Sequence, residues 1–349
     1  MKLFKKASSI IMVSILLLTV AVGCGQKKQE KVLNVYNWGD YIDESVIKDF
    51  EKEYGIKVKY ETYDTNESMY TKIKSGGSSY DVCIPSDYMI KKMINENMLE
   101  KLDFNNIPNY KNIEGKFKNL AFDPKSEYSV PYMWGTFGII YNSKMVKEPV
   151  DSWNILWDKK YKGEIVMFNS LRDTIAISLK RLGYSMNSIN PKEIEEAKKE
   201  LIKQKPLVRA YVVDEVKDIM RQGEAAMAVV WAGDAVTLIK ENPDLKYVIP
   251  KEGSNIWFDN MVIPKGAKNK KEAELFIDFM TKSEISKKNV EYIGYSTPNK
   301  EAFKMLDEET KNNKAAYPDD ALLKKCEVFI DLGENIKTYD KAWTEIIAK

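Results

Sequence analysis

Short apolar segments typical of buried strands alternate along this chain with longer segments whose apolar residues repeat every three or four positions. Residues 33–36, 81–84 and 226–230 are of the first kind, and residues 66–74 and 271–280 are of the second. Such alternation is typical of α/β folds built on a largely parallel sheet. The chain has 349 residues, which is enough for two lobes of ordinary domain size.

Five predicted strand ends share a chemistry of aromatic rings beside carboxylate or hydroxyl groups. In open α/β sheets, ligands bind outside the carboxyl ends of strands. Taken singly, each cluster is more typical of a packed ring and an aspartate that caps a turn. Together they predict a binding site, and its candidate residues are Trp38, Gly39, Asp40, Tyr41, Ser86, Tyr88, Asp173, Trp231, Asp234, Trp257 and Asp259.

The aspartates of these clusters are not accompanied by regularly spaced lysine or arginine residues. A buried carboxylate is costly without a positive partner, and removing one member of a buried ion pair costs about 3–5 kcal/mol. An aromatic face attracts an ammonium group by about 0.5–2 kcal/mol, depending on desolvation, and it also packs against methylene groups. This combination favours a ligand in which an alkyl chain joins ammonium groups.

The composition excludes several classes of function. The chain contains no histidine, so a Ser-His-Asp triad, a Cys-His dyad and a histidine-based zinc site are all impossible. For the same reason we expect ligand affinity to be nearly constant between about pH 6 and 8. The net charge of +2 does not indicate a nucleic-acid partner, and no motif predicts a metal or a cofactor. Cys83 and Cys326 could pair or stay reduced.

The amino terminus has the pattern of a bacterial export signal. A basic start precedes an apolar stretch over residues 10–22. Residues 21–24 resemble a lipobox, which implies a lipoprotein signal peptide over residues 1–23, cleavage before Cys24 and lipidation of its thiol. Residues 24–31 are then expected to form a flexible tether. An uncleaved membrane anchor and an ordinary secreted protein are the alternatives.

Several segments carry a resemblance to a known family, and they occur in order along nearly the whole mature chain. They are NWGDY (37–41), SVPYMWGT (129–136), WAGD (231–234), WFD (257–259) and IGYSTPN (293–299). Together they resemble the bacterial spermidine/putrescine-binding proteins of ABC importers. The resemblance implies a type II periplasmic-binding-protein fold, in which two α/β lobes joined by crossing strands close over the ligand.

We expect the chain to pass from the first lobe to the second beside the apolar segment at residues 132–142. This segment helps to divide the chain into two discontinuous lobes. We predict one lobe over residues 32–135 and 260–304, and the other over residues 136–259 and 305–349. Each lobe is expected to hold a mostly parallel sheet flanked by helices.

The resemblance also implies roles for individual residues. Asp259 corresponds to a carboxylate that holds an amine, and Asp173 stands where family members have glutamate or aspartate. Asp40 and Asp234 correspond to acids found in putrescine-type relatives. The remaining residues correspond to aromatic walls (Trp38, Tyr41), a polar-aromatic lip (Ser86, Tyr88) and a box around the methylene groups (Trp231, Trp257). Two departures from the family pattern leave the preferred polyamine undecided, at Ser170 and Phe329.

The expected function is that of a lipid-anchored, monomeric subunit of a polyamine importer, without catalytic activity, on the outer face of the cell membrane. Its ligand would be putrescine, spermidine or both, and its partners would be permease subunits with their ATPase. Three alternatives remain. They are a secreted glycosidase that uses two aspartates, a structural lipoprotein, and a binding protein for another solute. A carboxylate-bearing solute would need an arginine clamp, for which Arg172 and Arg209 are the candidates.

Overall fold

The computed structural model describes residues 31–76 and 79–349, so the predicted signal peptide and Cys24 lie outside the described residues. Strands and helices alternate along the described chain, as predicted. The strands are β1 (Lys31–Trp38), β2 (Ile56–Tyr63), β3 (Val82–Cys83), β4 (Ser129–Asn142), β5 (Ile165–Phe168), β6 (Val208–Val212), β7 (Met227–Trp231), β8 (Leu245–Val248) and β9 (Ile256–Val262). The α-helices are α2 (Glu44–Tyr54), α3 (Asn66–Lys74), α4 (Asp87–Asn95), α5 (Leu171–Arg181), α6 (Pro191–Gln204), α7 (Val216–Arg221), α8 (Ala232–Glu241), α9 (Lys270–Met280), α10 (Ser283–Ile293), α11 (Lys300–Met305), α12 (Glu308–Asn312), α13 (Asp320–Leu323) and α14 (Ile336–Ala348).

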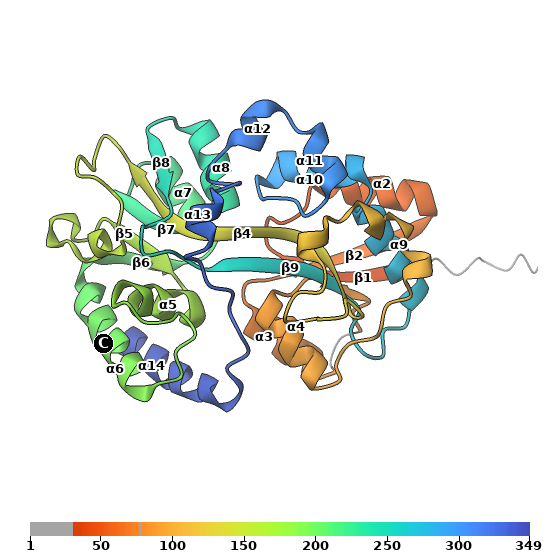
Figure 1. Cartoon of the computed structure of the whole chain (residues 1–349), viewed down its shortest axis with the longest axis horizontal. Coiled ribbons are helices and arrows are strands. Elements are labelled where there is room, and N and C mark those ends of the chain that lie inside the picture. Colours follow the sequence, from red (N-terminus) through yellow and green to blue (C-terminus); the bar gives the residue numbers. More distant parts are fainter. Residues whose placement is uncertain (1–30, 77–78) are drawn as a thin grey trace, which may run out of the picture.

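The strands form one continuous mixed sheet in the order β2-β1-β3-β9-β4-β7-β5-β6, with β8 paired to β4. Strand β1 is parallel to β2 and β3, and β5 is parallel to β6 and β7. The central strands β4 and β9 run antiparallel to their neighbours. The parallel groups belong to two lobes. The first contains β1–β3 with α2–α4 and α9–α11, and the second contains β5–β8 with α5–α8 and α14 (Figure 1).

The two central strands are the structural link between the lobes, and Figure 1 shows them running from one group of helices to the other. Strand β4 is fourteen residues long and buried along almost its whole length. Its first part, up to Thr136, pairs with β9, whereas its second part, from Phe137, pairs with β7 and β8. A single strand therefore contributes to the part of the sheet that lies in each lobe.

Apolar helix faces cover both sides of this sheet. In the first lobe, Phe50 of α2 packs edge-on against Phe276 and Phe279 of α9, with ring centroids 5.1 and 5.4 Å apart. In the second lobe, α5, α6 and α14 share a core that includes Leu201 and Tyr339. The C-terminal helix thus completes a lobe whose other helices are formed much earlier in the chain (Figure 1).

Local capping explains where several helices begin. The side chain of Asn190 accepts a hydrogen bond from the backbone N–H of Lys192 at 3.0 Å, and Pro191 occupies the first turn of α6. The hydroxyl of Ser170 caps α5 in the same way, by accepting from the backbone N–H of Asp173. These caps fix the points at which the chain turns from strand or loop into helix.

One part of the sequence interpretation is wrong. A strand was predicted to end at Trp257 and Asp259, but both residues lie inside β9. Cys83 and Cys326, the cysteines within the described residues, are both free, and Cys326 is only half-buried. Within the described residues, no helix combines the length and the apolar character needed to cross a bilayer.

Candidate functional site

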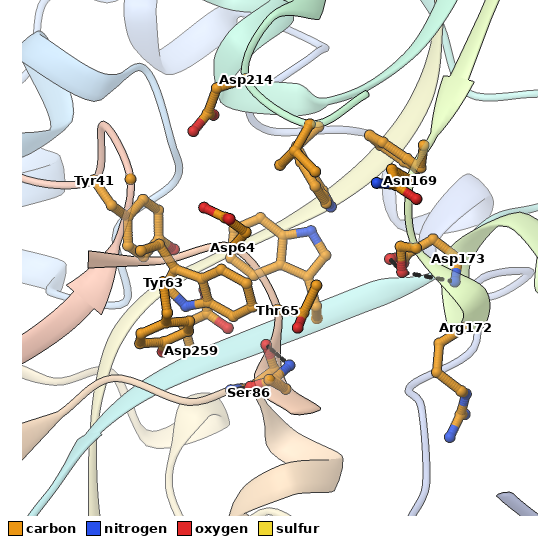
Figure 2. Close-up of a pocket in the computed structure, with 18 of the residues that line it drawn as sticks. Tyr41, Tyr63, Asp64, Thr65, Ser86, Asn169, Arg172, Asp173, Asp214 and Asp259 are labelled. Carbon is orange, nitrogen blue, oxygen red and sulfur yellow. Dashed lines mark hydrogen bonds between the residues drawn. The ribbon is translucent and has the colours of Figure 1, made fainter. Parts of the chain in front are cut away.

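A pocket lies between the two lobes and encloses about 980 Å³ of space that is partly open to solvent. All eleven residues that the sequence singles out line its wall: Trp38, Gly39, Asp40, Tyr41, Ser86, Tyr88, Asp173, Trp231, Asp234, Trp257 and Asp259. Figure 2 shows Asp173 and Asp259 on opposite sides of the pocket. The structure therefore brings residues from distant parts of the chain to a single cavity.

The turn after β1 carries three of these residues, Gly39, Asp40 and Tyr41, and has an unusual backbone. Asp40 has a φ of 44°, in the left-handed region that residues with a side chain rarely adopt. A Cβ atom at Gly39 would lie 2.6 Å from Oδ2 of Asp214. Because Asp214 follows β6 in the second lobe, the glycine allows the two lobes to approach closely at this end of the pocket.

Three indole rings of the pocket wall are each held by a specific contact. Trp38 donates its indole N–H to the backbone carbonyl that follows β3, at 2.8 Å. Trp231 stacks on Phe168, with centroids 4.2 Å and planes 26° apart. Trp257 meets the ring of Tyr295 edge-on, with centroids 5.4 Å apart. These contacts fix the indole rings in place before any ligand enters.

Asp259 is buried, with 5% of its surface exposed, and its Oδ1 atom has no hydrogen-bond partner within the described residues. Burial raises the pKa of Asp259 to about 7, although the hydroxyl groups of Ser86 and Tyr41 lower it. Trp257 lies two residues away on the same face of β9 and has an indole N–H that is also buried without a partner there. A buried acceptor without a donor requires an explanation, and a bound donor group supplies one.

Asp173 lies in the first turn of α5, on the second lobe. Ser170 donates its hydroxyl to Oδ2 of Asp173 at 2.6 Å. Burial raises the pKa of Asp173 to about 6, whereas the hydrogen bond from Ser170 lowers it and the nearby Glu67 raises it further. Ser170, one of the two departures from the family pattern, therefore orients the carboxylate of Asp173.

Ser86 and Tyr88 belong to a hydrogen-bonded network that extends to α3. The side-chain amide of Asn66 donates to Oγ of Ser86 and to the hydroxyl of Tyr88, both at 3.1 Å. Tyr88 in turn donates to Oε1 of Glu67 at 3.0 Å. The predicted polar-aromatic lip is thus held in place by two α3 residues that sequence reasoning missed.

Asp40 has a positive partner that the sequence does not reveal. Lys217 of α7 places its Nζ atom 2.6 Å from Oδ2 of Asp40 and 3.4 Å from Oδ1 of Asp214. The interpretation that these aspartates lack a protein cation is therefore wrong for Asp40. Asp234 lies in the same electrostatic environment, because burial raises its pKa to about 6 and Lys217 lowers it.

Sequence reasoning missed further residues of the pocket wall. Asp87 accepts hydrogen bonds from the backbone N–H groups of Tyr88 at 2.7 Å and Phe258 at 3.0 Å, and burial raises its pKa to about 8. Glu67 and Asp214 follow β2 and β6, so the strand-end rule could have found them. Other missed members of the wall include Tyr63, Asp64, Phe168, Lys217 and Tyr295.

Neither candidate arginine is placed to clamp a carboxylate ligand. Arg172 lines the wall, but it donates to a backbone carbonyl and a side-chain amide oxygen of the second lobe at 3.1 and 3.2 Å. Its guanidinium lies 4.6 Å from the ring centroid of Phe329 and points away from Asp173 in Figure 2. Arg209 pairs with Glu224 at 2.8 Å, outside the pocket wall.

The pocket wall is strongly acidic and strongly aromatic. It carries eight aspartate and glutamate residues against two basic residues, together with nine aromatic side chains. Within residues 31–76 and 79–349, no group of three or more acidic or cysteine residues is arranged to hold a metal ion. The arrangement suits a cationic ligand with apolar segments.

Comparison with known sequences identifies the class of protein. The profile of the bacterial extracellular solute-binding protein family matches residues 45–318, and the chain belongs to this family. It is a solute-binding protein and not an enzyme. Among curated relatives, the spermidine/putrescine-binding periplasmic protein of Salmonella typhimurium is 36% identical over 95% of this chain and 96% of its own length. The putrescine-binding periplasmic protein SpuD of Pseudomonas aeruginosa is 33% identical over 95% of this chain and 97% of its own length.

Solved structures agree with this assignment. A putative spermidine/putrescine ABC transporter protein from Listeria monocytogenes is 45% identical and superposes with a TM-score of 0.89 over 91% of this chain and 99% of that chain. The spermidine/putrescine ABC transporter substrate-binding protein PotD from Streptococcus pneumoniae is also 45% identical, with a TM-score of 0.78 over the same shares. The predicted family resemblance and the type II periplasmic-binding-protein fold are thereby confirmed.

Proposed function

We propose that this protein captures a polyamine, putrescine or spermidine, in the pocket between its lobes. The observation that carries the proposal is the buried and unpartnered Oδ1 of Asp259 in a wall of excess acidic charge and aromatic rings. An ammonium group supplies the hydrogen-bond donor that Oδ1 lacks and a positive charge beside the carboxylate. The names of the curated relatives, which bind spermidine and putrescine, support the same class of ligand.

In this proposal, binding replaces the water around a flexible polycation with fixed protein groups. One ammonium group pairs with Asp259 and stabilises the ionised carboxylate that burial disfavours. A second ammonium group pairs with Asp173 on the other lobe. The indole faces of Trp231 and Trp257 cover the methylene groups and attract the adjacent ammonium groups.

We propose that the lobes close around the ligand by a hinge motion, as proteins with two domains around a binding site often do. One lobe would comprise residues 32–135 and 260–304, and the other residues 136–259 and 305–349. The change of pairing partners along β4, between Thr136 and Phe137, supports this division. The closed form would then deliver its ligand to the permease subunits of an ABC importer.

The proposal includes export and anchoring on the outer face of the cell membrane. A signal peptide over residues 1–23 would be removed, Cys24 would carry lipid, and the protein would act as a monomer. The support is the sequence pattern, because these residues lie outside the described part of the chain. Mass spectrometry of the membrane-extracted protein should find lipid on Cys24, and Cys24→Ala should release the protein from the membrane. Wild-type protein with an unmodified Cys24 would contradict the anchor.

A thermal-shift panel tests the class of ligand. The panel contains putrescine, cadaverine, spermidine, spermine, sugars and amino acids. A ligand that binds only the native state stabilises it by about 2.7 kcal/mol at a concentration of 100 times Kd, so Tm must rise for at least one polyamine. A rise with sugars or amino acids and none with any polyamine would reject the proposal in favour of a binding protein for another solute.

A further inference from the structure

Lys217 carries an ammonium group from the second lobe into the pocket. Its side chain is only 15% exposed, and its Nζ atom lies 2.6 Å from Oδ2 of Asp40 in the first lobe. The same atom lies 3.4 Å from Oδ1 of Asp214. Burial alone would lower the pKa of Lys217, but Asp234, Asp40 and Asp214 together raise it, so the ammonium group stays charged.

The lysine side chain is chemically close to the proposed ligand. It consists of four carbon atoms that end in an ammonium group, which is putrescine with one amine replaced by the backbone. Asp40, Asp214 and Asp234 therefore surround an ammonium group of the kind that they would otherwise bind in a ligand. Within the described residues, the ion pairs of the pocket wall are those of Lys217, whereas Asp173 and Asp259 have none.

We propose that Lys217 fills one ammonium subsite of the pocket and thereby selects a diamine over a longer polyamine. The inference rests on the proposed polyamine-binding function. With Lys217 in place, Asp259 and Asp173 remain for the two ends of a diamine, and they lie on opposite sides of the pocket (Figure 2). A third ammonium group directed toward Asp40 would meet the like charge of Lys217 instead of a free carboxylate.

Isothermal titration of putrescine and spermidine against Lys217→Met tests the inference. Loss of the lysine frees a charged subsite, so the ratio of spermidine affinity to putrescine affinity should rise about tenfold. Lys217→Arg keeps the positive charge and should keep the wild-type ratio. Lys251→Met is the matched control, because Lys251 pairs with Asp151 at 3.2 Å outside the pocket wall.

Two results would overturn the inference. An unchanged ratio in Lys217→Met would show that the lysine does not select ligand length. An equal loss of affinity for both ligands would show that it only clamps the lobes together. If Lys217→Met does not melt cooperatively, Lys217→Gln, which removes the charge but keeps a hydrogen-bond donor, replaces it. Failure of the wild-type protein to bind any polyamine would instead reject the proposed function.

Discussion

At the scale of single residues, burial decides what the pocket can hold. Burial raises the pKa of four acids of the wall to between about 6 and about 8, and these acids are Asp87, Asp173, Asp234 and Asp259. In a chain without histidine, only strongly shifted groups can titrate between about pH 6 and 8, and these buried acids are such groups. A ligand with ammonium groups recovers the free energy that burial of these carboxylates costs.

Polyamine affinity should consequently depend on pH. The pKa of Asp259 is about 7 in the free protein, so its carboxyl is mostly ionised at pH 7.5 and mostly protonated at pH 5.5. Because an ammonium group binds the ionised form, Kd for putrescine should increase about tenfold or more as pH falls across this range. Isothermal titration in two buffers of different ionisation enthalpy should detect proton release at pH 6.5. Proton uptake, or a constant Kd, would contradict this assignment.

Asp259→Asn should stabilise the free protein at pH 7.5 while it weakens binding. The pKa of Asp259 is raised from its ordinary value of 3.8, so between that value and about 7 the folded state binds more protons than the unfolded state. The free energy of unfolding therefore falls as pH rises through this window. Asparagine has no charge to desolvate, and we expect a gain of about 1–3 kcal/mol in urea unfolding at pH 7.5.

The same variant should lose about 100-fold or more in putrescine affinity, because a ligand ammonium group would lose its charged partner. Asp151→Asn is the matched control. Asp151 is an exposed acid that pairs with Lys251 outside the pocket wall, so its loss should change neither stability nor affinity appreciably. Wild-type affinity in Asp259→Asn would remove Asp259 from the site.

At the scale of elements, local signals predict most of the fold. The expected helix over residues 66–74 agrees with α3, because the residue that caps it, Thr65, is adjacent in sequence. The principle that ligands bind at the carboxyl ends of strands found the acids after β1, β5 and β7, because each acid follows its strand closely in sequence. The predicted strand end at Trp257 and Asp259 is wrong because distant segments pair with β9 on both sides, so no local turn marks its limits.

The part of the site that the sequence could not predict depends on contacts between the lobes. Lys217 lies on a six-residue helix, and nothing in that short segment indicates that it faces Asp40 across the pocket. Asp87 resembles an ordinary first-turn acid, and only the packing of β9 against it buries its carboxylate. Residue types near strand ends are thus predictable, whereas their charge partners are not.

Gly135→Ala should disturb the pocket through the crossing strands. Gly135 of β4 pairs directly with Trp257 of β9, and a Cβ atom there would lie 2.7 Å from Cζ2 of the indole. We expect a loss of about 1–3 kcal/mol in stability, because the indole or the strand must shift, and weaker putrescine binding. Calorimetry should show both effects. Gly115→Ala is the control, since no atom lies within 4 Å of its added Cβ. Unaltered stability and affinity in Gly135→Ala would refute this close packing.

At the scale of the whole molecule, the distribution of charge matters more than its sum. The full chain has a net charge of only +2, yet eight acids and two basic residues face the pocket. A cleft lined by one sign of charge, between walls of low dielectric constant, concentrates counter-ions. The protein can therefore attract a polycation to its cleft while it stays nearly neutral overall.

The association rate of putrescine should accordingly fall as salt is added. The Debye length shortens from about 30 Å at 0.01 M to about 10 Å at 0.1 M ionic strength, which screens the field outside the cleft. Stopped-flow measurement of tryptophan fluorescence should follow binding, because Trp38, Trp231 and Trp257 line the pocket. Butylamine, with a single charge, should show a weaker salt dependence. A rate that is independent of ionic strength would argue against steering by the acidic wall.

The order in which the lobes acquire their parts also has a consequence for synthesis. The first lobe lacks α9 until the chain has passed through most of the second, and the second lobe lacks α14 until residues 336–348 are made. Neither lobe can reach its final packing while the ribosome is midway along the message. A nascent polypeptide of this design therefore stays incompletely folded until α14 has been synthesised.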